Sequence, residues 1–311
     1  MVDSLRARLG VCTDEVSANL EEALDSATAW GLREVEIQEF WGRSPIDATE
    51  ADLARARACL DARGLTVSAI GSQFLKLVML GHVPLGGVGR DPAFLADLAM
   101  LRAQIRAARV LGAPIVRAYA FRRDEMIGLG NPSPRLPRGG PLPDAILEKI
   151  VEGLRISATI AADAGIVLGL ENVRSCWANT GYNTGTILRA VDHPALQAIW
   201  DPGNCYVSGG DPYPEGYEAV RGRICHVHIK DACVTDPATG LIEWRAVGQG
   251  EVDWAAQCAA LRRDGYAGGL SLETHWHPPG PTGSPNKIED SRISLTGIER
   301  VMAASMGIGE L

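Results

Sequence analysis

The sequence has few aromatic residues, no excess of positive charge and no long apolar run. Lysine and arginine number 30 against 38 aspartates and glutamates, so the formal net charge is −8. Nucleic-acid binding depends on a basic surface that neutralises phosphates, and this balance therefore argues against a nucleic-acid partner. No apolar run approaches the ~18 residues that a transmembrane helix needs, so we expect no membrane span.

The seven cysteines lack the paired spacing of metal-binding or redox motifs. No Cys-x-x-Cys pair occurs, and most of the cysteines lie within apolar runs. We therefore expect small buried side chains in a reducing compartment. The first residues, MVDSLRARLGVCTDEV, also lack the apolar segment of a signal peptide. Together these observations predict a cytoplasmic protein.

The sequence does contain a repeated alternation of short apolar strands and amphipathic helices. We predict eight strands, at residues 8–13, 34–38, 65–70, 114–119, 166–171, 196–201, 224–230 and 268–273. A helix follows each strand, and the first helix is predicted to begin at Asn19, with Glu22 completing a capping box. Eight such units without an interior linker predict a (β/α)₈ TIM barrel, with residues 1–311 forming a single domain.

An open doubly wound sheet is the alternative fold. The residues after the first strand read CTDEVS, however, without the Gly-x-Gly-x-x-Gly nucleotide fingerprint that such a sheet usually carries.

Two further expectations concern the connections between strands and helices. The longest irregular stretch covers residues 121–142 and is rich in Pro, Gly and Arg, and we interpret it as a lid. The chain between the seventh strand and a helix at 253–264 is predicted to be a loop.

The seventh predicted strand carries an unusual set of polar residues. In RGRICHVHIKD (221–231), side chains alternate between two faces, so His226, His228 and Lys230 point the same way. Polar rings and a charge on one face of a buried strand must be hydrogen-bonded, hydrated or bound to a ligand. For either histidine alone, a hydrogen-bonded place in the core is the alternative.

Acidic residues end three other predicted strands. Glu171 ends the fifth, Asp201 the sixth and Glu273 the eighth, and active sites of such barrels lie at the C-terminal ends of the strands. Three neighbouring carboxylates repel one another unless they are protonated or bridged by a cation. With His228 they make an oxygen-rich ligand set that suits Mn²⁺, Mg²⁺ or Co²⁺. Taken singly, each acid has a rim salt bridge as its alternative.

Five runs in the second half of the sequence resemble a known family. The runs GLENV (169–173), WDPGN (200–204), HVHIKD (226–231), VGQGEVDW (247–254) and GYAGGLSLETHW (265–276) are similar to xylose isomerase-like TIM barrels of the sugar phosphate isomerase/epimerase type. Residues 31–37 agree more loosely. The resemblance implies that Glu171, Asp201, His228 and Glu273 bind one divalent metal. Mn²⁺ is expected first, with Mg²⁺, Co²⁺ and Zn²⁺ as alternatives.

The resemblance also implies a reaction. Members of the family remove a proton next to a carbonyl through an enediolate and return it elsewhere. We therefore expect a metal-dependent isomerase or epimerase acting on a sugar or sugar phosphate. Glu171 and Glu273 are the expected acid/base pair, because their strands can flank a bound substrate. The expected partners are a small carbohydrate and, on resemblance alone, further copies of the chain in a homodimer or homotetramer.

Seven residues are candidates for substrate binding. Lys230 would stabilise an oxyanion or bind a carboxylate or phosphate, and its alternative is an ion pair with Asp231 or another rim acid. Glu36 and Arg117 face inward near strand ends, where a buried ion pair is the favoured alternative. The remaining candidates are His226, Asn204, Trp177 and His275. Ordinary packing is the alternative for Trp177 and His275, and a hydrogen-bonded place in the core is the alternative for His226.

The sequence departs from the ketohexose 3-epimerases of this family. Where those enzymes have a His, a Glu and an Arg, this chain has Asn204, Trp177 and Val234, so a typical free-ketohexose 3-epimerase is not expected. The Asp-x-Asp cluster of two-metal xylose isomerases is also missing. The alternative function is a lyase on the same scaffold, similar to inosose dehydratases, 3-dehydroshikimate dehydratases or 3-keto-glycoside lyases. A sugar-binding protein without catalysis is the third possibility.

Overall fold

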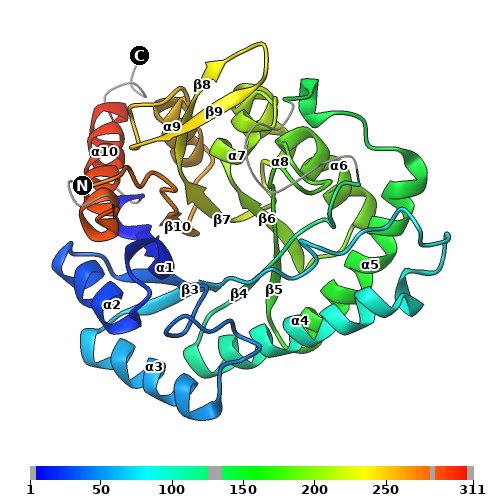
Figure 1. The fold of residues 1–311 in the computed structure, drawn as a ribbon, viewed down its shortest axis with the longest axis horizontal. Helices are drawn as coiled ribbons and strands as arrows, with labels where there is room; N and C mark the ends of the chain where they lie inside the picture. Colours follow the sequence, from blue (N-terminus) through cyan, green and yellow to red (C-terminus); the bar gives the residue numbers. More distant parts are fainter. Residues whose placement is uncertain (1–4, 125–134, 281–283, 307–311) are drawn as a thin grey trace.

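Eight parallel strands close into a barrel in a computed structural model that describes residues 5–124, 135–280 and 284–306 (Figure 1). The order around the barrel is β1-β10-β7-β6-β5-β4-β3-β2. The strands are β1 (Leu9–Cys12), β2 (Glu34–Ile37), β3 (Thr66–Ile70), β4 (Ile115–Ala118), β5 (Val167–Glu171), β6 (Leu196–Trp200), β7 (Ile224–Ile229) and β10 (Gly269–Leu272). The predicted (β/α)₈ TIM barrel is confirmed, because β10 pairs with β1 and closes the ring.

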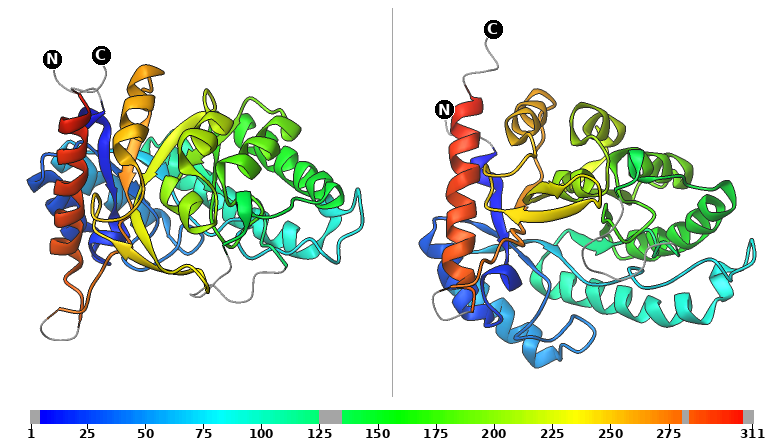
Figure 2. Two further views of the ribbon diagram at one scale, coloured as in Figure 1. Left: turned by 90° about the horizontal axis from the view of Figure 1, so that it is seen from above. Right: turned by 45° about the horizontal axis from the view of Figure 1, so that its top comes forward.

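Helices connect the strands and surround the ring (Figures 1 and 2). They are α1 (Thr13–Val16), α2 (Leu20–Ala29), α3 (Glu50–Arg63), α4 (Pro92–Leu111), α5 (Asp144–Asp163), α6 (Gly181–Val191), α7 (Pro202–Val207), α8 (Tyr217–Val220), α9 (Trp254–Arg263) and α10 (Lys287–Ser305). Within the described ranges, none of these helices combines the length and the apolar character that crossing a bilayer requires.

The capping box predicted at the start of α2 is wrong. The Asn19 side chain accepts the N–H of Glu21, as an N-cap should, but Glu22 does not return a bond to Asn19. The Ser17 hydroxyl lies between them, because it accepts the Asn19 N–H at 3.1 Å and donates to the Glu22 carboxylate. A reciprocal box does form at α3, where Thr49 and Asp52 bond each other's backbone N–H groups.

Residues 231–245 form a β-hairpin, which corrects the loop predicted there. Strands β8 (Asp231–Asp236) and β9 (Leu241–Arg245) pair antiparallel and extend away from the barrel strands (Figure 2). The Asp236 side chain closes the turn by accepting the Ala238 N–H and the Thr239 hydroxyl. The run DPATG between two apolar stretches was the available signal, since Asp, Pro and Gly favour such turns.

Two other expectations need adjustment. Helix α6 begins at Gly181 and not near 184, because the Thr180 hydroxyl caps it by accepting the Asn183 N–H. Helix α7, directly after β6, was not predicted at all. The lid predicted for residues 121–142 includes residues 125–134, which lie outside the described residues.

The inside of the barrel is apolar toward one end and polar toward the other. Ala69, Ile115 and Ile199 form a small buried cluster inside, separate from the large core between strands and helices. Gly169 leaves room for it, because a Cβ at that position would lie 2.6 Å from Ile199 Cγ1. Toward the C-terminal ends of the strands the interior is filled by buried charged and polar side chains, and the candidate site is built there.

Candidate functional site

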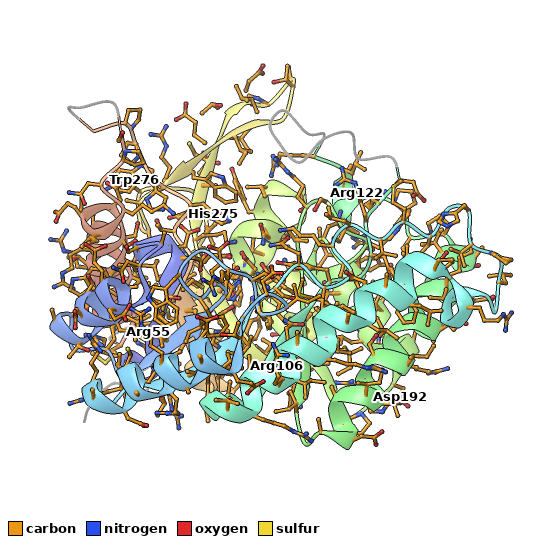
Figure 3. The ribbon with its side chains drawn as sticks, turned by 60° about the horizontal axis from the view of Figure 1, so that its bottom comes forward. Arg55, Arg106, Arg122, Asp192, His275 and Trp276 are labelled. Atoms are coloured by element: carbon orange, nitrogen blue, oxygen red, sulfur yellow. The ribbon has the colours of Figure 1, made fainter. Side chains whose placement is uncertain are left out.

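The candidate site lies where the barrel strands end. Arg122, which follows β4, and His275, which follows β10, lie toward one end of the molecule (Figure 3). Asp192, which precedes β6, lies toward the opposite end (Figure 3). The end with Arg122 and His275 is therefore the C-terminal mouth of the barrel, where active sites of this architecture lie.

Four predicted ligands converge at this mouth. Glu171 ends β5, Asp201 follows β6, His228 lies on β7 and Glu273 follows β10. Each offers one ligand atom, and these four atoms all lie within 4.8 Å of one another. His228 Nδ1 is 3.3 Å from Glu171 Oε1 and 3.4 Å from Glu273 Oε2. All four side chains are buried, and the cluster can hold a metal ion.

The chemistry of this cluster fits a divalent cation. His228 Nδ1 is buried without a hydrogen-bond partner among the described residues, and Glu171 Oε2 has an ion pair with Arg117 at 3.2 Å but no hydrogen bond there. Such atoms are costly in a protein interior unless a ligand satisfies them. Burial opposes ionisation of His228, but Glu36, Glu171 and Glu273 raise its pKa well above the usual value. A metal at Nδ1 would take the place of a proton, so its affinity is coupled to pH.

Glu36 determines which nitrogen of His228 faces the cluster. Its Oε2 lies 2.9 Å from His228 Nε2, and because a carboxylate only accepts, Nε2 donates and Nδ1 is left for a ligand. The same oxygen is 3.2 Å from His226 Nε2, which also contacts the Ser271 hydroxyl at 2.8 Å. Burial opposes ionisation of Glu36, yet the two histidines hold its pKa well below the usual value. Glu36 and His226 are thus buried beside the ligand set.

Replacing Glu36 with Gln should weaken Mn²⁺ binding by roughly 10- to 100-fold, because an amide no longer orients the imidazole as a carboxylate does. Competition with a chelating dye measures the dissociation constant. Glu34→Gln is the matched control, since Glu34 lies on the same strand but faces Arg8. Equal Mn²⁺ affinity in the wild type and the Glu36 variant would contradict this role.

Helix α7 positions Asp201. The Asp201 Oδ1 atom caps the helix by accepting the Asn204 N–H at 2.7 Å. The Asn204 amide donates to Asp201 Oδ2 at 2.8 Å and to Glu171 Oε1 at 3.2 Å. Asn172 bonds both the N–H and the C=O of Asp201. Asn204, predicted to bind substrate, therefore orients two of the predicted ligands, and its substrate contact stays a prediction.

Lys230 is buried between two of the predicted ligands. Its Nζ is 2.8 Å from Asp201 Oδ2 and also donates to Glu273 Oε2. Burial opposes the charged form, but these carboxylates raise the pKa of Lys230 above its usual value. Gly203 makes room for the side chain, because a Cβ there would be 2.4 Å from Lys230 Cγ. The alternative of an ion pair is thus realised, and contact of Lys230 with substrate stays a prediction.

Asp231 does not pair with Lys230. Its carboxylate accepts four backbone N–H groups, those of Ala232, Gly248, Gly250 and Val252. These bonds tie the end of the hairpin and the following loop to β7. The runs HVHIKD and VGQGEVDW therefore form one structural unit beside the site.

Arg117, on β4, balances the buried carboxylates. One guanidinium nitrogen lies 3.2 Å from Glu171, 3.6 Å from Glu273 and 3.8 Å from Glu36. Burial opposes ionisation of Glu171, but Arg117 and His228 lower its pKa. Burial likewise opposes ionisation of Glu273, and Lys230 and His228 lower its pKa. The buried ion pair expected as the alternative for Glu36 and Arg117 is present, and contact of either with substrate stays a prediction.

Trp177 and His275 lie in different surroundings. Trp177 is buried, and the Arg123 guanidinium stacks 4.6 Å above its ring. His275 is at the mouth, with Nδ1 3.0 Å from Glu15 and Nε2 3.4 Å from Lys230 Nζ. The hairpin contributes Trp244, whose ring meets His275 edge-on at 5.1 Å. Of the two, His275 has the more direct contact with the ligand cluster.

Sequence reasoning missed four residues near this cluster: Gln38, Tyr119, Lys76 and Glu15. Gln38 donates to Glu273 and accepts from Arg117. Burial raises the pKa of Tyr119, and its hydrogen bond with Glu171 raises it further. Gln38 and Tyr119 each come two positions after a recognised inward residue, so strand alternation could have identified them. Lys76 and Glu15 lie outside the strands and had no such signal.

Comparison with known proteins finds a matching protein family and a similar curated protein for this chain. A family model described as xylose isomerase-like TIM barrel matches residues 24–295. A 3-dehydroshikimate dehydratase of Pseudomonas putida is 32% identical over 136 residues, which cover 40% of this chain and 20% of that protein. The match thus spans about a fifth of the length of that curated relative.

Solved structures are similar over nearly the whole chain. D-allulose 3-epimerase from Methylomonas sp. in complex with D-allulose has a TM-score of 0.67 at 19% identity, covering 95% of this chain and 96% of that one. A probable 3-DHS dehydratase from Bacillus anthracis has a TM-score of 0.65 at 17% identity, covering 94% and 97%. At sequence identities this low, the similarity shows a shared fold.

Proposed function

Because the chain belongs to the xylose isomerase-like TIM barrel family, we propose that it is a metal-dependent isomerase or epimerase acting on a sugar or sugar phosphate. The observation that carries the proposal is the convergence of Glu171, Asp201, His228 and Glu273 at the barrel mouth. In this proposal the four residues hold one divalent ion, and Mn²⁺ suits three carboxylates and one imidazole best.

The proposed chemistry is proton transfer next to a carbonyl. A divalent ion held by these residues supplies a Lewis acid that polarises the carbonyl and acidifies the adjacent C–H bond. Glu171 and Glu273 are the proposed proton carriers. Arg117 and His228 favour the ionised form of Glu171, while Lys230 and His228 favour that of Glu273, so both carboxylates carry the negative charge of a base before the reaction begins.

The positions of the two carboxylates support transfer between faces or carbons of a substrate. β5 and β10 are separated in the barrel by β6 and β7, so Glu171 and Glu273 enter the mouth from different sides. Arg117 contacts both and keeps them near each other. One carboxylate can take a proton and the other can return one, which an isomerase or epimerase requires.

A lyase is the second candidate function. The sequence similarity to a 3-dehydroshikimate dehydratase favours it, and the departures at Asn204, Trp177 and Val234 weigh against a ketohexose 3-epimerase. A lyase begins with the same loss of a proton next to a ketone. It then expels a group from the neighbouring carbon, so the same base serves both reactions.

Metal analysis combined with product analysis tests the proposal. The purified protein is analysed for bound metal, stripped with a chelator, reloaded with Mn²⁺, and assayed with ketoses, ketose phosphates and 3-dehydroshikimate. We expect activity to disappear on chelation and to return with Mn²⁺. A product of equal mass supports the isomerase, and loss of water supports the lyase. Full activity in the metal-free protein would rule out both.

A further inference from the structure

Three loops join to form one side of the barrel mouth. They follow β3, β4 and β5, and backbone hydrogen bonds link them. The Tyr119 N–H donates to the Phe74 carbonyl at 3.1 Å and the Arg122 N–H to the Val78 carbonyl at 2.9 Å. The Arg123 N–H donates to the Ser175 carbonyl at 3.0 Å. These loops carry four cationic residues, which we call the basic rim: Lys76, Arg122, Arg123 and Arg174. Of these four residues, Lys76 is near enough to the ligand cluster for Glu171 and Glu273 to influence its pKa.

Lys76 differs from Arg117 and Lys230, two cationic side chains that contact the ligand cluster. Both of those form ion pairs with predicted ligands at 3.2 Å and 2.8 Å. Lys76 is half-buried, and no carboxylate among the described residues forms an ion pair with it. Its Nζ lies 4.9 Å above the ring of Tyr119, and Glu171 influences the pKa of both residues.

Lys76 is held in place by an unusual backbone. The preceding residue, Leu75, has a φ of 65°, although its side chain is fully buried. Asp97 on α4 accepts the Leu75 N–H, Gln73 accepts the Lys76 N–H at 2.9 Å, and the Cys176 thiol donates to the Lys76 carbonyl. A non-glycine residue in this region of φ persists only where its surroundings impose it, and such residues cluster at functional sites.

We propose that Lys76 binds an anionic group, a carboxylate or a phosphate, on the substrate. The inference rests on the proposed function and narrows it to polyhydroxy carbonyl compounds that carry a negative charge. An ammonium that forms no ion pair with a carboxylate among the described residues offers a compact point charge to either anion. Lys76 contacts the Tyr119 ring, and Glu171 influences the pKa of both residues, so the anion would lie near the proposed proton carrier.

The electrostatics of Lys76 agree with this geometry. Burial lowers the pKa of Lys76, and the neighbouring Arg117 lowers it further, while Glu171 and Glu273 oppose them. A bound anion would supply the missing counter-charge. A neutral ketose would leave the ammonium half-buried and unpaired, so the site should discriminate against it.

Calorimetric binding to the Mn²⁺-loaded protein tests the proposal without any turnover. The probes are D-fructose, D-fructose 6-phosphate and 5-keto-D-gluconate, which are neutral, phosphorylated and carboxylated. We expect at least one anion to bind the wild type more tightly than D-fructose. Lys76→Met should weaken binding of that anion at least about tenfold and leave D-fructose within about twofold. Whichever anion shows the loss identifies the group.

Two controls separate charge from structure. Lys76→Arg keeps the charge and should retain most of the anion affinity, whereas Gln73→Met alters an exposed neighbour in the same turn and should change nothing. Equal weakening of neutral and anionic probes, a wild type that prefers D-fructose, or no binding of either anion at millimolar concentration would overturn the proposal. Charge-dependent binding through Lys76 without turnover on any substrate would instead contradict the proposed function alone.

Discussion

Replacing Glu171 with Gln should lower kcat/KM by about a thousandfold while the barrel stays folded. The amide keeps the shape of the side chain and can still contact Asn204, so the loss is chemical and not structural. An amide cannot take a proton from carbon, and it is a poorer ligand for a hard divalent ion. Steady-state kinetics on the substrate found by product analysis, with circular dichroism as a check on folding, measure the effect.

The matched control for Glu171 is Glu243→Gln on the hairpin. Glu243 is exposed and pairs only with Arg245 among the described residues, so its removal should leave kcat/KM within a factor of two to three. If the Glu171 variant keeps a tenth or more of the wild-type activity, Glu171 is neither the base nor an essential ligand. Retained ligand affinity with no activity in either protein would favour the binding-protein alternative.

Replacing Arg117 with Met should destabilise the metal-free protein by about 3–5 kcal/mol. Arg117 is buried and lies within 4.0 Å of three carboxylates, Glu36, Glu171 and Glu273. Met fills much of the same volume, so the main change is the loss of a positive charge among buried negative ones. Urea unfolding of the chelated protein at neutral pH measures this free energy.

The metal should reverse part of the Arg117 effect. Mn²⁺ bound at the ligand cluster would restore positive charge near Glu171 and Glu273, so the variant should gain more stability from Mn²⁺ than the wild type does. Arg189→Met is the control, because Arg189 is exposed and its loss should change stability by no more than about 0.5 kcal/mol. A loss below about 1 kcal/mol in the Arg117 variant would mean that these carboxylates are protonated in the folded protein.

Residues near the strand ends show how much of the site can be predicted from the local sequence pattern. Alternation along a strand places a side chain inward or outward, and strand ends in a parallel barrel meet at one mouth. That was sufficient to predict the convergence of Glu171, Asp201, His228 and Glu273. The hairpin at 231–245 also had a local signal, the turn run DPATG, which the sequence interpretation passed over. The capping box at Asn19 failed because Ser17, two residues earlier, accepts the Asn19 N–H and donates to the Glu22 carboxylate, while the Asn19 side chain accepts the Glu21 N–H.

The sequence by itself determined the barrel and the four residues that meet at its mouth, because both follow from the periodicity of strands and helices along the chain. Only the tertiary structure decided which nitrogen of His228 faces that cluster and that Lys230 pairs with Asp201 and Glu273. It also decided that Lys76 forms no ion pair with a carboxylate in the part of the chain that the structure describes. These outcomes depend on charges brought together from strands and loops far apart in sequence. No local pattern encodes how such charges pair, since pairing depends on distances that exist only after the barrel has closed.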